Sequence, residues 1–228
     1  MRGSGLKAIA AILRKDLRVE LRTKESVPAM ALFAVTTFVI FHFGLDRSSL
    51  EGDLAAGVLW VTLLFAAILG INRLFVAERE QSGFDGILLA PIERNALLVA
   101  KATALFVYLV ALESIALPVF ALFFLDSGFW KALPLLVVIV LLADIGIAVV
   151  GALLSSIAVN TRARDLLLPL LLLPLVVPVM IAAAAATDPL LSTPIDRSDA
   201  LQWLAVLALY DAVFGLLAYA LFDFLMEE

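Results

Sequence analysis

Six long apolar segments constrain this chain more than any other feature of its sequence. Each is close to the roughly 20 residues that an α-helix needs to cross about 30 Å of hydrocarbon. Hydrophobic residues make up 64% of the 228 residues and charged residues 16%, against about 25% charged residues in an ordinary soluble domain. The sequence therefore predicts an all-α polytopic membrane protein and excludes a water-soluble globule. The six predicted transmembrane spans are residues 28–45, 54–71, 96–125, 132–156, 166–187 and 201–225.

Composition and missing motifs exclude several classes of function. The chain has no cysteine, which removes thiolate metal sites, iron–sulfur clusters and Cys-x-x-Cys redox chemistry. Its net charge of -5 argues against nucleic acid as a partner. It contains one histidine, no Gly-x-Ser-x-Gly elbow and no Gly-x-x-x-x-Gly-Lys-Ser/Thr phosphate loop. We therefore expect no catalytic residue and no metal site, and we expect any ATP that drives this chain to be bound by another polypeptide.

The distribution of Lys and Arg predicts how the chain lies in the membrane. Basic residues close to span ends stay on the cytoplasmic side. Thirteen of the sixteen lie before the first span, between the second and third or at the entrance to the third, or between the fourth and fifth. The other three are Arg47, Lys131 and Arg197. We therefore expect both termini in the cytoplasm.

Residues 1–26 have the pattern of an amphipathic helix. Leu6, Ile9, Leu13, Leu17 and Leu21 recur at steps of three and four residues, with basic residues between them. Such a helix would lie on the inner leaflet, with its apolar stripe in the acyl boundary and its cations at anionic head groups. The alternative is a plain positively charged anchor with no further role. The sequence leaves both interpretations open.

The connection between the second and third spans, residues 72–95, mixes charged and large apolar side chains. Gly83 and Gly86 allow turns, and Pro91 would end a short helix. That helix would carry one apolar face formed by Phe84, Ile87, Leu88 and Leu89. Something must cover this face: the inner leaflet, the rest of the chain or a partner protein. Composition alone does not separate these three possibilities.

Four polar side chains lie within predicted spans. They are Glu113, Asp144 and Asp211, with His42 near the outer end of the first span. An ionisable residue at a helix centre costs about 2.5 to 3.5 kcal/mol on insertion scales, so each requires a reason. Converging carboxylates would form a relay or cation site, as in a proton-coupled secondary transporter. We favour the other interpretation, in which each acid is protonated or hydrogen-bonded to a neighbouring helix and stabilises the bundle.

Several short motifs, in order along nearly the whole chain, resemble one known family. They are Arg14-Lys-Asp-Leu-Arg-Val-Glu-Leu-Arg22, Gly57-Val-Leu-Trp-Val61, Arg73-Leu-Phe75, Glu80-Gln-Ser-Gly83, Leu88-Leu-Ala-Pro91, Ala100-Lys101 and Leu173-Pro-Leu-Val-Val-Pro-Val179. This pattern resembles the cytochrome c maturation protein B family of haem exporter permease subunits, and more distantly the type-2 ABC exporter permeases. The last of these motifs is similar to the family's proline-broken fifth span. The segment from Asp211 onward matches least.

The resemblance implies an ABC-2-type permease that forms a single transmembrane domain over residues 1–228. Residues 1–26 would be its cytoplasmic surface helix, 28–225 its six spans and 72–95 its cytoplasmic coupling loop. It would work in the bacterial inner membrane with a separate ATP-binding subunit that carries ATP-Mg, a haem-handling membrane subunit and a periplasmic haem chaperone. Haem would be bound by a partner subunit, and this chain would hold no cofactor. By the same resemblance, the residues seated in a groove of the ATPase would be Glu78, Arg79, Glu80, Gly83, Phe84, Asp85, Gly86, Leu88, Leu89 and Pro91.

Overall fold

The computed structural model describes residues 2–45, 49–76, 94–125, 129–158, 161, 163–192, 195 and 198–225. Every regular element in these ranges is an α-helix, as the apolar pattern predicts. The helices are α1 Arg2–Thr23, α2 Ser26–Gly44, α3 Gly52–Arg73, α6 Arg94–Phe124, α7 Phe129–Ala158, α8 Arg164–Leu191 and α9 Ser198–Leu225.

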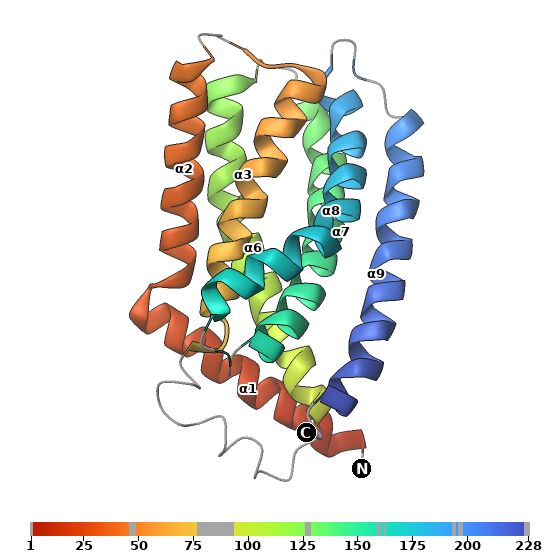
Figure 1. The fold of residues 1–228 in the computed structure, drawn as a ribbon. Helices are drawn as coiled ribbons and strands as arrows, with labels where there is room; N and C mark the ends of the chain where they lie inside the picture. The colour runs from red at the N-terminus through yellow and green to blue at the C-terminus, as the bar shows by residue number, and fades with distance from the viewer. Residues whose placement is uncertain are drawn as a thin grey trace.

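Six of the described helices, α2 to α9, are long and apolar enough to cross a membrane. They run side by side, and α1 lies across one end of the bundle (Figure 1). We call this the α1 end and the other the opposite end. α3 is the most enclosed of the six, whereas α2 and α9 are the most exposed. The six predicted spans are therefore confirmed, and the chain is a multi-pass membrane protein.

The turn from α1 to α2 is held by one carboxylate. Lys24 adopts a left-handed conformation with φ of 53°, and its N–H donates to the Glu20 carbonyl at 2.7 Å, which ends α1. The Glu20 side chain then accepts the N–H groups of Ser26 at 3.0 Å and Val27 at 2.8 Å. These donors have no partner within α2, because they belong to its first turn. Glu20 therefore satisfies two backbone N–H donors at the start of α2 and links the two helices.

α1 confirms the predicted amphipathic helix, but not all of its apolar stripe faces lipid. Ile12, Leu13 and Leu17 pack against the buried core of the bundle, where α1 contacts α6. Leu6 and Leu21 remain 71% and 75% exposed. The helix therefore uses the middle of its stripe for packing within the protein and leaves its ends free for the membrane boundary.

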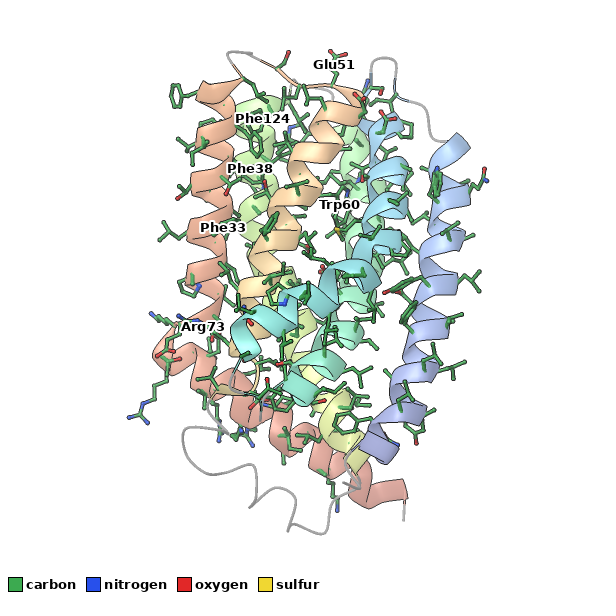
Figure 2. The ribbon with its side chains drawn as sticks, viewed as in Figure 1. Phe33, Phe38, Glu51, Trp60, Arg73 and Phe124 are labelled. Atoms are coloured by element: carbon green, nitrogen blue, oxygen red, sulfur yellow. The ribbon has the colours of Figure 1, made fainter. Side chains whose placement is uncertain are left out.

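At the opposite end, aromatic side chains fill the space between α2 and α6. Phe38 on α2 and Phe124 on α6 have ring centroids 6.1 Å apart (Figure 2), and Phe120 packs 5.3 Å from Phe38. The N–H of Leu50 donates to the Phe124 carbonyl at 2.9 Å, so the end of α6 also holds the connection before α3.

A polar contact joins α3 to α8. Trp60 of α3 donates its indole N–H to the Thr187 hydroxyl of α8 at 3.0 Å. Polar contacts therefore pin a largely apolar bundle at a few points.

The expected break in the fifth span is not found. α8 is one continuous helix that contains Pro169, Pro174, Pro178 and Pro189, although its direction changes along its length (Figure 1). Prolines within a helix remove backbone N–H donors and bend it, and neighbouring helices in a membrane can satisfy the backbone there. The Tyr210 hydroxyl of α9 donates to the Leu175 carbonyl, between Pro174 and Pro178, at 2.8 Å. α9 is therefore attached to the proline-rich part of α8.

We predict that Gly151→Ala destabilises the bundle, because α7 approaches α3 closely there. A Cβ at Gly151 would lie 2.8 Å from Ile71 Cδ1 and 3.1 Å from Leu105 Cδ2. Overpacking of this kind costs about 1 to 3 kcal/mol in the free energy of unfolding. The control is Gly57→Ala, because a Cβ at Gly57 meets nothing within 4 Å. Unfolding of the two detergent-solubilised variants should separate them, and equal losses would contradict this account of the packing.

Candidate functional site

A buried lysine joins three helices at the α1 end. Lys101, in the second turn of α6, is only 1% exposed. Its ammonium donates a hydrogen bond to the Leu74 carbonyl at the end of α3, at 3.0 Å. The same nitrogen lies 3.0 Å from Asp16 Oδ2 of α1 and 4.9 Å from the centroid of the Phe75 ring. One cation therefore contacts α1, the end of α3 and the segment that follows α3.

Asp16 is the anionic partner in this junction and is itself 8% exposed. Its second carboxylate oxygen lies 3.1 Å from the ammonium of Lys15, and its backbone carbonyl accepts the Tyr108 hydroxyl at 3.3 Å. The contact of Oδ2 with Lys101 is a charge contact without hydrogen-bond alignment. The middle of α1 is therefore attached to α6 at two levels, Lys101 and Tyr108.

Burial makes the pairing energetically necessary. A buried ion that loses its partner costs several kcal/mol, because neither water nor an opposite charge then compensates it. The Lys101 ammonium also lies at the negative end of the α3 dipole, where the last carbonyls lack partners within the helix. Another of these carbonyls, that of Ile71, accepts the Ser155 hydroxyl of α7 at 3.1 Å. The end of α3 is therefore held by side chains from both α6 and α7.

Sequence reasoning missed this junction. It used Lys101 only as an orientation marker and as part of a motif, and gave Asp16 no role. The available signal was one charge on each of two stripes that are otherwise apolar. Asp16 is at helical spacing from Leu13, and Lys101 from Leu97 and Leu105. Opposite charges at such positions on different helices are candidates for a buried pair.

The predicted coupling residues, Glu78 to Pro91, lie outside the described residues. The described chain stops at Val76 on one side of this segment and resumes at Arg94 on the other. The junction involves both flanks, because Leu74 and Phe75 precede the segment and Lys101 follows it. The Lys101 contacts therefore anchor the chain on both sides of residues 77–93.

Two of the three intramembrane acids come together. Glu113 on α6 and Asp144 on α7 are both buried and lie close enough to interact electrostatically. If the two carboxyl groups share a hydrogen bond, one of them must carry a proton.

Asp211 lies elsewhere, on α9 against Gly146 of α7. A Cβ built at Gly146 would lie 2.7 Å from Asp211 Oδ1, so the close approach of the two helices depends on this glycine. Gly146 is two residues from Asp144 and thus about 200° around the axis of α7. The carboxylate oxygens of Asp211 are buried and find no hydrogen-bond partner within the described ranges. The three acids therefore do not form one cluster.

His42 lies apart from the acids, among aromatic rings at the opposite end. Its ring centroid is 5.1 Å from that of Phe123, 5.3 Å from that of Phe43 and 5.8 Å from that of Phe124. Phe123 is ten residues beyond Glu113 on α6, or about 15 Å along the helix. In the part of the chain that the structure describes, no three His, Cys, Asp or Glu side chains gather as a metal site.

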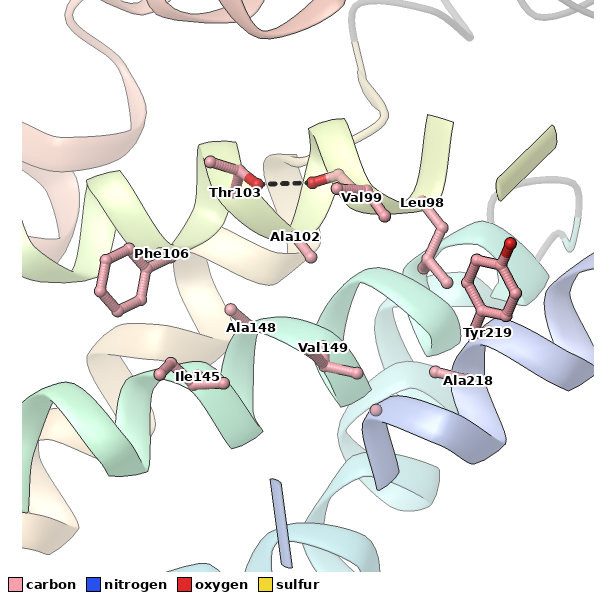
Figure 3. A pocket seen from close by; sticks show the side chains of 11 residues that line it. Leu98, Val99, Ala102, Thr103, Phe106, Ile145, Ala148, Val149, Ala218 and Tyr219 are labelled. Carbon is pink, nitrogen blue, oxygen red and sulfur yellow. Dashed lines mark hydrogen bonds between the residues drawn. The ribbon is translucent and has the colours of Figure 1, made fainter. Parts of the chain in front are cut away.

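An apolar groove of about 360 Å³ lies between α6, α7 and α9 (Figure 3). Ala102 and Phe106, Ile145 and Val149, and Tyr219 are among its lining residues. The Thr103 hydroxyl at its side is used within α6, where it donates to the Val99 carbonyl at 2.7 Å (Figure 3). The lining therefore suits hydrocarbon and offers no charged group to a polar ligand.

Comparison with known proteins agrees with this architecture. A family model described as CcmB protein matches residues 7–222. The chain belongs to the CcmB protein family. The match runs from α1 to α9 and includes Asp16, Lys101 and the three intramembrane acids. The match also continues past Asp211. The sequence from Asp211 onward was expected to resemble the family least, but the family model still includes it as far as residue 222.

Curated relatives cover most of the chain. The heme exporter protein B of Paracoccus denitrificans is 33% identical over 178 residues, which are 77% of this chain and 80% of the relative. That of Bradyrhizobium diazoefficiens is 29% identical over 218 residues, 94% of this chain and 96% of the relative. That of Pseudomonas aeruginosa is 27% identical over 197 residues, 86% of this chain and 87% of the relative. The chain and these relatives therefore correspond over at least 77% of this chain.

The buried ion pair predicts a specific pattern of stability. Lys101→Met should lower the free energy of unfolding by about 3 to 5 kcal/mol, because it leaves the buried Asp16 carboxylate without its main partner. The double variant Asp16→Asn with Lys101→Met should recover most of this loss, because no buried charge remains unpaired. Denaturant unfolding of the purified chain in detergent measures both. A double variant no more stable than the single one would contradict the pairing.

The carboxyl pair predicts a different response at Glu113. Glu113→Gln should cost less than about 1 kcal/mol, because the amide can still donate to Asp144, whereas Glu113→Leu should cost about 1 to 3 kcal/mol by leaving a buried acid unsatisfied. Ser114→Ala is the control, because the Ser114 hydroxyl donates only within its own helix, to the Ala111 carbonyl. Thermal unfolding in detergent checks the order. Equal losses for the Gln and Leu variants would show that the hydrogen bond contributes nothing.

Proposed function

We propose that this chain is the membrane permease subunit of an ABC-type complex that handles haem for cytochrome c maturation, and that ATP is hydrolysed on a partner chain. The family match over residues 7–222 carries the proposal, together with relatives that are named heme exporter protein B. The fold fits this role, since it provides six potential spans and a surface helix at one end. This chain would be non-catalytic.

The sequence supports the proposal of a separate ATPase. None of the five lysines follows a glycine, so the chain lacks the loop that cradles nucleotide phosphates. An external motor changes the conformation of a permease only if it binds its two states with different affinity. To shift a 1:99 equilibrium to 99:1, that difference must be about 10⁴-fold, or about 5.5 kcal/mol. The permease must therefore offer the ATPase a contact that differs between states.

The segment between α3 and α6 is the proposed contact. It carries the apolar side chains Phe84, Leu88 and Leu89, and a groove on the ATPase would cover them. Because the charges of the Lys101 junction hold both flanks of the segment, a displacement of the segment would reach the bundle. The inner leaflet and the rest of the chain remain the alternative covers, and the experiment below distinguishes the ATPase from both.

This function also proposes a location and an orientation. The α1 end would face the cytoplasm, because thirteen of the sixteen basic residues belong to the segments at that end. The chain would lie in the bacterial inner membrane with both termini on the cytoplasmic side. The opposite end, with its short connections, would face a periplasmic haem chaperone.

Haem is the proposed cargo of the complex, held by a separate haem-handling membrane subunit. His42 is the only histidine of this chain, and three phenylalanine rings pack around it. The lining of the groove between α6, α7 and α9 is apolar and contains one residue of a type that can ligate haem iron, Tyr219. With a single candidate ligand in each place, we assign the iron to a partner subunit, and this chain would supply conformational change.

We predict that Leu88→Asp and Gly83→Pro abolish co-purification of the ATPase with the tagged permease. The first places a charge on the apolar face and the second stiffens the proposed turn. The matched control is Leu201→Asp, an equal change at an exposed position on the opposite end. The variants should still insert and accumulate normally. Undiminished capture of the ATPase by both loop variants would discard the docking role of this segment.

The proton-coupled secondary transporter is not favoured, because the relatives are named heme exporter protein B and, among the described residues, the three acids do not gather at one place. Its test is the triple variant Glu113→Gln, Asp144→Asn and Asp211→Asn. We expect normal yields of holo-cytochrome c in cells that depend on this variant. Loss of cytochrome at normal abundance of the chain would favour the transporter instead.

A further inference from the structure

We propose that α1 is a moving part of the permease, and that Lys101 is the positioning residue that makes it follow the segment between α3 and α6. This inference rests on the proposed function and adds a route to it: from the end of α3 through Lys101 to Asp16, along α1 to Glu20, and into the start of α2. Nothing in a plain membrane anchor requires such a route.

The first step of the route is a shared cation. The Lys101 ammonium contacts the Leu74 carbonyl and Asp16 Oδ2, each at 3.0 Å. Leu74 lies two residues before Val76, the last described residue ahead of the segment. On the other side, Lys101 lies about 10 Å along α6 from the start of that helix. A displacement of either flank would therefore reach the ammonium over a short length of chain.

The second step is the stiffness of the contact. Lys101 is 1% exposed, so water does not replace Asp16 if the two separate. Separation of α1 from α6 would take Asp16, with its neighbour Lys15, away from the buried Lys101 ammonium, whereas movement of α1 together with α6 and the end of α3 keeps this contact. The Tyr108 hydroxyl adds a second attachment at the Asp16 carbonyl. α1 should therefore move with the flanks of the segment rather than slide past them.

The third step carries the movement to α2. Glu20 lies one turn beyond Asp16 on α1, and its carboxylate accepts the N–H groups of Ser26 and Val27 at the start of α2. Glu25, the residue before α2, forms an ion pair with Arg73 at 3.2 Å, which links the start of α2 to the end of α3. α2 is among the least enclosed of the six long helices. Its core contacts are made by one face, which carries Met30, Ala34 and Phe38.

The competing interpretation is that the Lys101 contacts hold α1 in one fixed position. The chain is well suited to a direct test between the two. It contains no cysteine, so two introduced cysteines are the only labelling sites on this chain, and the chain is labelled before it is combined with its ATPase. Spin labels at Arg18→Cys on α1 and Leu201→Cys on α9, both exposed positions, report the position of α1 relative to a helix outside the route. The distance between the labels is measured in the complete complex with its ATPase, without nucleotide and with a non-hydrolysable ATP analogue.

We expect the analogue to shift the distance in the otherwise unchanged chain, and the shift to be lost in Asp16→Asn with Lys101→Met. This double variant leaves no unpaired buried charge, so it should fold and still capture the ATPase. Its ATPase should keep the KM for ATP and lose the increase in kcat that the permease confers. Tyr108→Phe, which removes the second attachment but keeps the ion pair, should retain the shift.

A double variant that keeps both the shift and the increase in kcat would overturn the inference, as would an unchanged chain whose labels do not respond to the analogue. Failure of the proposed function gives a different result, because the unchanged chain would then capture no ATPase at all. That result would remove the inference together with its basis.

Discussion

A lysine ammonium buried in an otherwise apolar protein is the interaction on which the α1 end of this structure depends. Lys101 has no access to water and neutralises its charge against Asp16 while donating to the Leu74 carbonyl. Because these partners belong to different helices, the cost of burying the charge is offset only when α1, α3 and α6 are assembled together. The position of α1 is therefore set by electrostatics more than by its apolar stripe.

The other polar contacts in the bundle act locally, each between two helices. Trp60 with Thr187, Tyr210 with the Leu175 carbonyl, and Ser155 with the Ile71 carbonyl join pairs of neighbours. Such contacts have few competitors in an apolar bundle, so each one selects a particular rotation of the helices. The α1 end differs because its contacts share members and form a connected set. Because of this difference, a movement that a partner causes at one of these contacts would also reach the others.

Much of the architecture could be predicted from the sequence, and the rest could not for identifiable reasons. Hydropathy located the six spans because the bilayer thickness demands a minimum apolar length. It could not show that Glu113 meets Asp144 while Asp211 meets Gly146, because that depends on how each helix is rotated against its neighbours. Prolines suggested a broken fifth span, but α8 is continuous, and the Tyr210 hydroxyl of α9 attaches to its proline-rich part. The pair Asp16 and Lys101 was missed because each charge was assessed on its own helix.

The central claim is that energy enters this permease from an external ATPase at the α1 end, through the segment between α3 and α6. Site-specific photo-crosslinking in cells tests it most directly, with a photoreactive amino acid placed either at Phe84 in that segment or at Glu51 at the opposite end (Figure 2). The account predicts a crosslink to the ATPase from position 84 and none from position 51. A crosslink only to lipid from position 84, with the ATPase captured from position 51, would contradict it.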